Sequence, residues 1–146
     1  MYPELPQRAY ESLKALCCLA SSKKPLRAHE VAARTSLPPA QTAKILQQLT
    51  WAGFVESRRG TKGGFWLLKP AASIRVTDVV SFFTRPTSER QLEDPVLQAL
   101  TQATKQCRKE LDHITVADLA EVSASKAAKS KGQNGTSGRQ RVKEQQ

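Results

Sequence analysis

The sequence predicts a mainly α-helical fold with one small β-hairpin, followed by a long helix. Three observations carry this prediction. Apolar residues recur at helical spacing through most of the first half of the chain, two short β-like runs flank a glycine-rich turn at 58–64, and an apolar stripe follows Pro95. A chain of 146 residues has room for one domain, or for one small domain with an appendage.

Three helices are expected before the hairpin. The first covers residues 7–20, and a short second helix covers about 29–34, although Arg27 stands where a Ser or Thr cap is usual. The third is better marked, because Pro39 suits the first helical position and a glycine follows the end of its apolar stripe. We expect this third helix over 39–52.

The hairpin is expected to pair the runs 54–57 and 65–68 around a basic turn rich in glycine. Glycine in such a turn lets the backbone take positive φ and approach a partner closely. After the hairpin, Thr77 is expected to cap a short helix that ends at Phe83, with Asp78 placed favourably in its first turn.

A long helix is expected from Pro95 to Asp112, with its apolar residues on one face. A capping box at 115–118, with Asp in place of Glu, then starts a last short helix that ends near Val122. The remaining residues, 124–146, are too polar to bury a core, and we expect them to form a disordered basic tail.

The formal net charge of +10 is divided unevenly among three segments. Residues 1–75 hold 12 basic and 4 acidic residues (+8), residues 76–123 hold 5 and 8 (−3), and residues 124–146 hold 6 and 1 (+5). We therefore divide the chain into a basic first domain, a mildly acidic helical segment and a basic tail. The basic domain and the basic tail indicate a polyanionic partner.

Several classes of protein are excluded by what the sequence lacks. It has no run of about 18 apolar residues for a membrane-spanning helix and no signal peptide, so we expect a soluble cytoplasmic protein with no membrane partner. Its three cysteines form no CxxC pair, and His29 and His113 have no second ligand type nearby, so we assign no disulfide framework and no metal site. No hydrolase or nucleotide-binding motif is present, and we expect no catalytic activity.

The order helix, helix, turn, helix and hairpin is that of a winged helix-turn-helix. In that fold a helix enters the DNA major groove, about 12 Å wide, while basic residues at the hairpin tip reach the backbone or the minor groove. The third helix is therefore expected to expose polar side chains, and the hairpin tip to offer charge and close backbone approach. The helix residues are Gln41, Lys44, Gln47 and Gln48, and the tip residues are Arg58, Arg59, Gly60, Lys62, Gly63 and Gly64.

A longer motif carries a resemblance to a known family. Residues 43–67 read Ala-Lys-Ile-Leu-x-x-Leu-x-x-Ala-Gly-Phe-Val-x-Ser-x-Arg-Gly-x-Lys-Gly-Gly-Phe-x-Leu. This motif resembles the recognition helix and wing of the Rrf2 family of bacterial transcription regulators, to which IscR, NsrR and CymR belong. The likeness covers about residues 6–122, with further matches at 8–16, 74–80 and 114–119.

The resemblance implies a homodimeric regulator of transcription whose two chains cross through their long helices. It also implies that the dimer binds a palindromic operator with two recognition helices and two wings. We expect it to act as a repressor. The family's DNA contacts map onto Pro39, Ala40, Gln41, Lys44, Arg59, Gly60, Lys62 and Gly63. Residue chemistry adds Gln48 and Arg58 to this set. The dimer contact is expected to use the apolar stripe of the long helix, because a monomer would leave it exposed to water. Its members are Val96, Leu100, Ala103, Cys107, Leu111 and Ile114.

The sequence differs from cluster-binding members of the family at the positions of the cluster ligands. Cluster-binding members place three cysteines in the loop before the dimer helix, whereas residues 84–94 contain none, and Ala9 stands where some members have an acidic ligand. Thiolates are the ligands that hold iron–sulfur clusters. We therefore expect no cluster and no other cofactor, and the signal that the protein senses stays open.

Other interpretations remain open. The polar face of the third helix could bind a protein instead of DNA, or a small molecule could bind between the winged domain and the dimer helices. Cys18 lies about 100° around the first helix from Cys17 and could act as a thiol switch. Trp51 could stack on DNA or pack on the hairpin. A footprint with dyad symmetry is expected only from a DNA-binding regulator.

Overall fold

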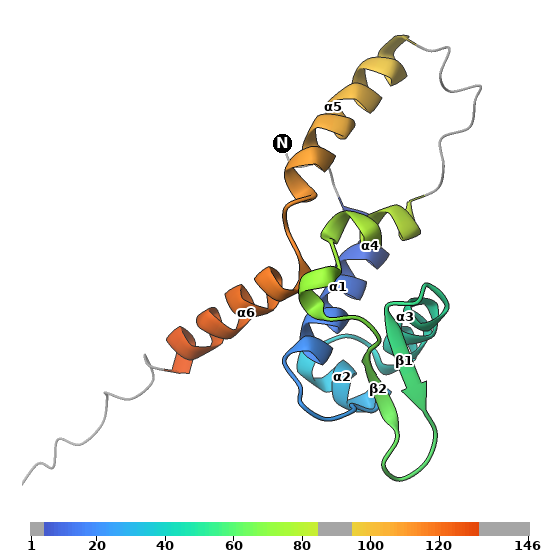
Figure 1. Ribbon diagram of the computed structural model, residues 1–146, viewed down its shortest axis with the longest axis vertical. Helices are drawn as coiled ribbons and strands as arrows, with labels where there is room; N and C mark the ends of the chain where they lie inside the picture. Colours follow the sequence, from blue (N-terminus) through green and yellow to red (C-terminus); the bar gives the residue numbers. More distant parts are fainter. Residues whose placement is uncertain (1–4, 85–94, 132–146) are drawn as a thin grey trace, which may run out of the picture.

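In the computed structural model, residues 5–84 and 95–131 are described. They form a bundle of helices with one two-stranded hairpin, from which a long helix projects (Figure 1). Three helices come first, α1 (Gln7–Ala20), α2 (Ala28–Thr35) and α3 (Pro39–Trp51), and the hairpin of β1 (Val55–Arg58) and β2 (Gly64–Leu67) follows. This order confirms the predicted winged helix-turn-helix.

The first three helices begin and end where local signals place them. α1 buries one apolar stripe that includes Ala9, Leu13 and Leu16. α2 has no side-chain cap from Arg27, but the Arg27 backbone N–H donates to Oε2 of Glu30 at 2.7 Å, which satisfies one free donor of the helix start. α3 begins at a proline, as predicted, and Gly53 after it takes φ 79°.

The hairpin has a third backbone partner that lies before α2. β1 and β2 pair antiparallel, with Val55 opposite Leu67. On the other edge of β2, Phe65 exchanges two backbone hydrogen bonds with Leu26, at 2.7 and 3.0 Å. A Cβ on Gly64 would lie 2.9 Å from the Leu26 carbonyl oxygen, so glycine is needed for this close approach. The α1–α2 connection is thereby fixed against the wing.

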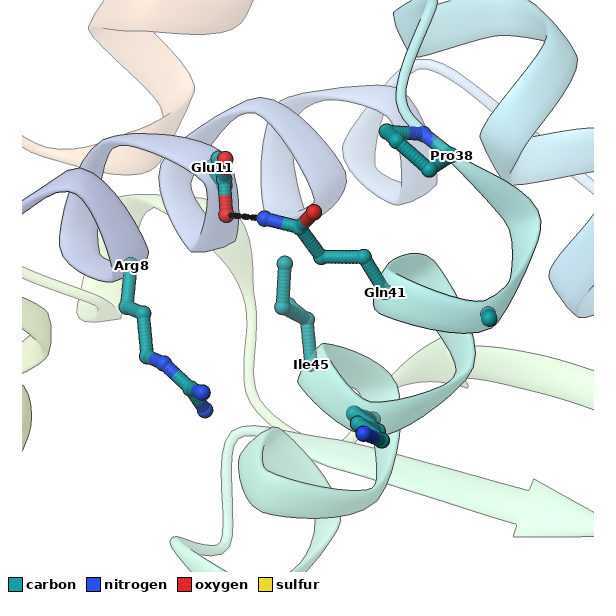
Figure 2. A pocket seen from close by; sticks show the side chains of 7 residues that line it. Arg8, Glu11, Pro38, Gln41 and Ile45 are labelled. Carbon is teal, nitrogen blue, oxygen red and sulfur yellow. Dashed lines mark hydrogen bonds between the residues drawn. The ribbon is translucent and has the colours of Figure 1, made fainter.

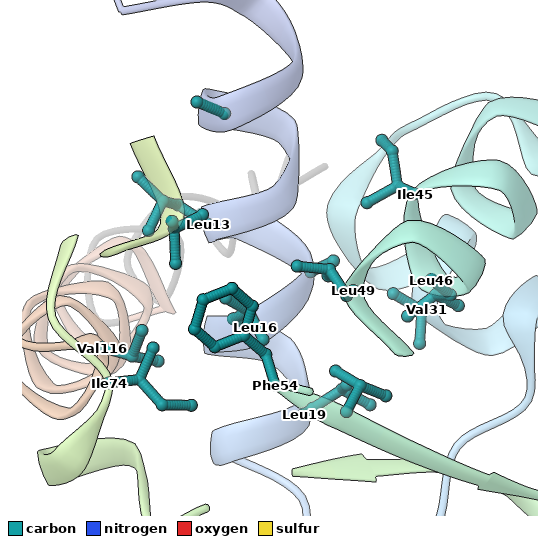
Figure 3. Close-up of a cluster of buried hydrophobic side chains, with 14 of the residues drawn as sticks. Leu13, Leu16, Leu19, Val31, Ile45, Leu46, Leu49, Phe54, Ile74 and Val116 are labelled. Atoms are coloured by element: carbon teal, nitrogen blue, oxygen red, sulfur yellow. The ribbon is translucent and has the colours of Figure 1, made fainter. Parts of the chain in front are cut away.

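One hydrophobic core joins the elements, with α1 running through its middle (Figure 3). Ile45, Leu46 and Leu49 of α3 pack on one side of α1. Ile74 and Val116 pack on the other side, although the sequence division at residue 75 separates them. The core therefore continues across residue 75, and Val116 packs in the same core as α1 and α3.

After the hairpin, a 3₁₀ turn η1 (Ala71–Ser73) leads into α4 (Val76–Phe83). The prediction that Thr77 caps this helix is wrong, because the N-cap position belongs to Arg75, whose backbone N–H donates to Oδ2 of Asp78 at 3.4 Å. Thr77 is buried and donates instead to Oδ1 of Asp112 at 2.6 Å. This bond ties α4 to the segment that follows the long helix.

The last two helices are α5 (Pro95–Leu111), which projects from the body, and α6 (Val116–Lys131) (Figure 1). The predicted capping box is confirmed, since the Thr115 backbone N–H donates to Oδ2 of Asp118 at 2.8 Å, and this hydrogen bonding holds the pKa of Asp118 below its ordinary value. The predicted end near Val122 is wrong, because α6 continues through residues 124–131, which the sequence placed in the tail. The predicted tail from 132 to 146 lies outside the described residues.

The start of α6 is part of the main body. The backbone N–H of Val116 donates to the Ile74 carbonyl at 2.9 Å, and that of Val76 donates to the Ile114 carbonyl at 3.0 Å. Among the helices that the structure describes, none is long and apolar enough to cross a membrane.

Candidate nucleic-acid interface

The outward face of α3 carries four side chains in one stripe. Ala40, Lys44, Gln47 and Trp51 are all exposed, and Trp51 has 80% of its surface exposed. Steps of three and four residues place side chains on one side of a helix. This stripe, which we call the α3 stripe, is therefore open to a partner along the whole helix, and Trp51 is not packed on the hairpin.

Two glutamines at the edge of the α3 stripe are held by α1. Nε2 of Gln41 donates to Oε2 of Glu11, and Oε1 of Glu11 accepts a second hydrogen bond from Nε2 of Gln7 at 2.9 Å. One turn earlier on α1, Nη1 of Arg8 donates to Oε1 of Gln48 at 3.4 Å. Glu11 is 4% exposed, so its carboxylate lies inside the protein.

These contacts differ from the expectation that Gln41 and Gln48 are freely exposed, since both are half-buried. The reason is geometric: seven residues apart, they lie on the same flank of α3, and that flank faces α1. Gln47 and Trp51 occupy the outward face instead. Gln47 was predicted to be exposed on this helix, and its helical spacing was the signal for it.

A cavity of about 420 Å³ lies between α1 and the first turn of α3. Figure 2 shows Glu11 and Gln41 reaching toward each other from the two helices beside it. The cavity brings together the predicted residues Ala40, Gln41 and Lys44 with two α1 residues that the sequence did not indicate. Its lining consists of Arg8, Glu11, Pro38, Ala40, Gln41, Lys44 and Ile45.

The wing presents its basic residues to solvent. Arg58, Arg59 and Lys62 are all exposed, and the turn between them closes with a hydrogen bond from the Gly63 N–H to the Gly60 carbonyl at 3.1 Å. Gly60 takes φ 110°, and a Cβ on Gly63 would lie 2.1 Å from the Arg58 carbonyl oxygen. The predicted glycines are thus required by the shape of the tip.

A second hollow, of about 400 Å³, lies between the wing and the α1–α2 connection. Four of its seven lining residues are basic and none is acidic; they are Ser22, Lys23, Lys24, Pro25, Arg58, Lys62 and Trp66. Nη2 of Arg27 donates to the Thr61 carbonyl at 3.3 Å, which adds a contact between the two segments. Lys23 and Lys24 were not predicted as site residues, because the Leu26–Phe65 pairing that brings them to the wing is not visible in the sequence.

The apolar stripe of α5 is open to solvent over most of its length. Val96 is 67% exposed and Leu100 is 58% exposed, and Ala103 and Cys107 are exposed as well. Leu111 and Ile114 are half-buried, and Ile114 packs against the core of its own chain. A single chain therefore covers only the C-terminal end of the stripe.

The three cysteines lie on two helices. Cys17 and Cys18 are half-buried on α1, and Cys107 is exposed on α5. Burial, with a smaller contribution from Cys18, raises the pKa of Cys17 to about 11, and burial also raises the pKa of Cys18, although Arg34 opposes this. Within residues 5–84 and 95–131, no group of three or more His, Cys, Asp or Glu could hold a metal ion.

Comparison with known proteins agrees with this architecture. A sequence model of the Rrf2 family, described as an iron-dependent transcriptional regulator, matches residues 5–122. The structure is similar to that of Staphylococcus aureus CymR, with 26% identity, a TM-score of 0.65, and coverage of 80% of this chain and 97% of that one. It is also similar to T. potens IscR, with 22% identity and a TM-score of 0.68. The match covers 92% of this chain and 94% of that one. CymR (YrzC), the global cysteine regulator of B. subtilis, is similar as well, with 22% identity and a TM-score of 0.66. The match covers 83% of this chain and 98% of that one.

Proposed function

The chain belongs to the Rrf2 family of transcriptional regulators, and from this membership we propose that it is a homodimeric repressor that binds a palindromic operator through recognition helix 39–52 and wing 58–64. The observation that carries the proposal is the open α3 stripe beside a basic wing. A helix face and a basic hairpin tip exposed together are the two parts with which a winged helix-turn-helix reads duplex DNA.

The two parts have different roles in this proposal. Lys44 and Gln47 of the α3 stripe reach base edges in the major groove, where lysine suits guanine acceptors and glutamine suits adenine. Arg58, Arg59 and Lys62 contact phosphates or the minor groove, and they position the protein without reading sequence.

The second hollow extends this backbone contact. Lys23 and Lys24 lie beside Arg58 and Lys62 in one basic surface that is fixed to the wing by the Leu26–Phe65 pair. We therefore include these two lysines among the phosphate contacts. Each additional phosphate contact strengthens binding and makes it more dependent on salt.

The homodimer is proposed from the α5 stripe. Val96 and Leu100 are large apolar side chains that lie mostly in solvent in a single chain. Two copies crossed through α5 would cover them, and a two-fold dimer presents the same DNA-binding surface twice, which matches a palindromic operator. The protein acts without catalysis and, given its cysteine positions, without an iron–sulfur cluster.

Selection of bound fragments from random duplex DNA, followed by footprinting, tests the function. The proposed regulator enriches one sequence and protects it with dyad symmetry. A winged-helix module that binds proteins would instead leave DNA affinity at the non-specific level, typically 10⁻⁴–10⁻⁶ M at physiological salt. Failure to enrich any sequence would refute the proposal.

A further inference from the structure

We propose that Glu11 is a positioning residue that sets the base preference of the recognition helix by fixing the side-chain amide of Gln41. The inference deepens the proposed function and rests on it, because it supposes that α3 reads DNA. It starts from the hydrogen bond that joins the two side chains across the α1–α3 contact (Figure 2).

The chemistry of this bond determines which end of the Gln41 amide points at Glu11 and which end points away from it. A carboxylate only accepts hydrogen bonds, so the NH₂ group of Gln41 must point at Glu11. The carbonyl oxygen of Gln41 then lies on the side away from Glu11, as Figure 2 shows. With Leu or Ala in place of Glu11, nothing in this contact would distinguish the two ends of the amide.

Glu11 is itself held in place. It is 4% exposed, and Gln7 binds its other carboxylate oxygen at 2.9 Å. A buried acceptor whose two oxygens are both engaged cannot turn to solvent without losing these bonds. The orientation of Gln41 is therefore imposed by the protein before DNA arrives.

The carbonyl oxygen of Gln41 is the end of the amide that Glu11 leaves available, and an acceptor has a definite preference among bases. In the major groove adenine and cytosine offer an amino donor, whereas guanine offers only acceptors. Gln41 borders the cavity of about 420 Å³ whose rim includes the exposed Ala40 and Lys44, so a base edge can approach it there. Gln41 should favour adenine or cytosine and disfavour guanine at one position of each half-site.

The test compares sites selected from random duplex DNA by the full-length wild type, by Glu11→Gln and by Gln41→Ala. Glu11→Gln keeps the size of the side chain but adds a donor, so that the amide of Gln41 can face either way. We expect the wild type to disfavour guanine at one position per half-site by about fivefold or more, the worth of one hydrogen bond. In Glu11→Gln this discrimination should fall below about twofold, with the other positions and the salt dependence unchanged.

Gln41→Ala and its combination with Glu11→Gln separate positioning from a structural role. Gln41→Ala should lose the preference at the same position, and adding Glu11→Gln to Gln41→Ala should change the selected site no further. A uniform loss of affinity for all sequences in Glu11→Gln, or a wild-type site selected by Gln41→Ala, would overturn the assignment. These outcomes leave the proposed function intact, whereas a wild type that selects no site refutes the function itself.

Discussion

Removal of two wing cations gives a quantitative test of DNA binding. Arg59 and Lys62 are exposed at the hairpin tip, so replacing both with alanine should hardly affect folding. A homodimer loses two cations from each chain. If each one neutralises a phosphate, the slope of log K against log salt becomes less negative by up to about 3.6, because one contact in B-DNA contributes about 0.9. Between 50 and 200 mM salt, the wild type should then lose about 150-fold more affinity than the variant.

The assay is fluorescence anisotropy of a labelled operator duplex at a series of salt concentrations in that range. Lys105→Ala combined with Lys109→Ala is the matched control, because it removes the same charge from exposed positions of α5 on the side opposite the apolar stripe. Its slope should stay that of the wild type. If the wing variant and the wild type have equal slopes of log K against log salt, phosphate contact by the wing is refuted. If the control variant changes the slope as much as the wing variant does, the change is an effect of net charge alone.

Three other expectations concern α5, the α1–α2 connection and Cys17. Leu100→Asp, which places a charge on the exposed apolar stripe of α5, should convert a dimer into a monomer at micromolar concentration in sedimentation, and a variant that stays dimeric would exclude this stripe from the interface. Lys23→Ala with Lys24→Ala should reduce the salt slope in the dimer by up to about 3.6, and an unchanged slope would remove the α1–α2 connection from the DNA contact. At pH 7.5 about one Cys17 thiol in three thousand is ionised if its pKa is about 11, so iodoacetamide should label it far more slowly than free cysteine and faster as the pH rises; labelling at the rate of free cysteine would contradict this.

Local signals were sufficient for most of the fold. Pro39, the glycine after α3 and the capping box at 115–118 each act within one helical turn, so the sequence alone places those ends. Thr77 failed as a cap because the start of α4 depends on the backbone pairing of Ile74 and Val76 with the segment before α6, which lies about forty residues away.

The end of α6 was mispredicted for a different reason. Residues 124–131 are polar apart from alanine, and this polarity predicted disorder. Alanine and lysine are among the best helix formers, so a helix that already has a fixed start can continue through them without burying a new apolar face. The described residues show this continuation to Lys131.

The candidate site was predictable only where one element determines it. Helical spacing found Lys44 and Gln47, and the hairpin turn found Arg59 and Lys62. Glu11 could not be found in this way, because its partner on α3 is 30 residues away in the sequence and a charged residue on a helix is normally exposed. Long-range contacts of this kind decide which polar side chains near an interface are free and which are fixed.

These long-range contacts give α1 a particular place in any control of DNA binding. On one side α1 packs against α4 and α6. The bond of Thr77 to Asp112 ties α4 to the residue that follows α5, and the bond of Val116 to Ile74 ties the start of α6 to the segment before α4. On its other side α1 holds two glutamines of α3 through Arg8 and Glu11. Because packed interiors transmit strain, these contacts place α1 between α5 and α3. A signal could thus change operator affinity without touching α3.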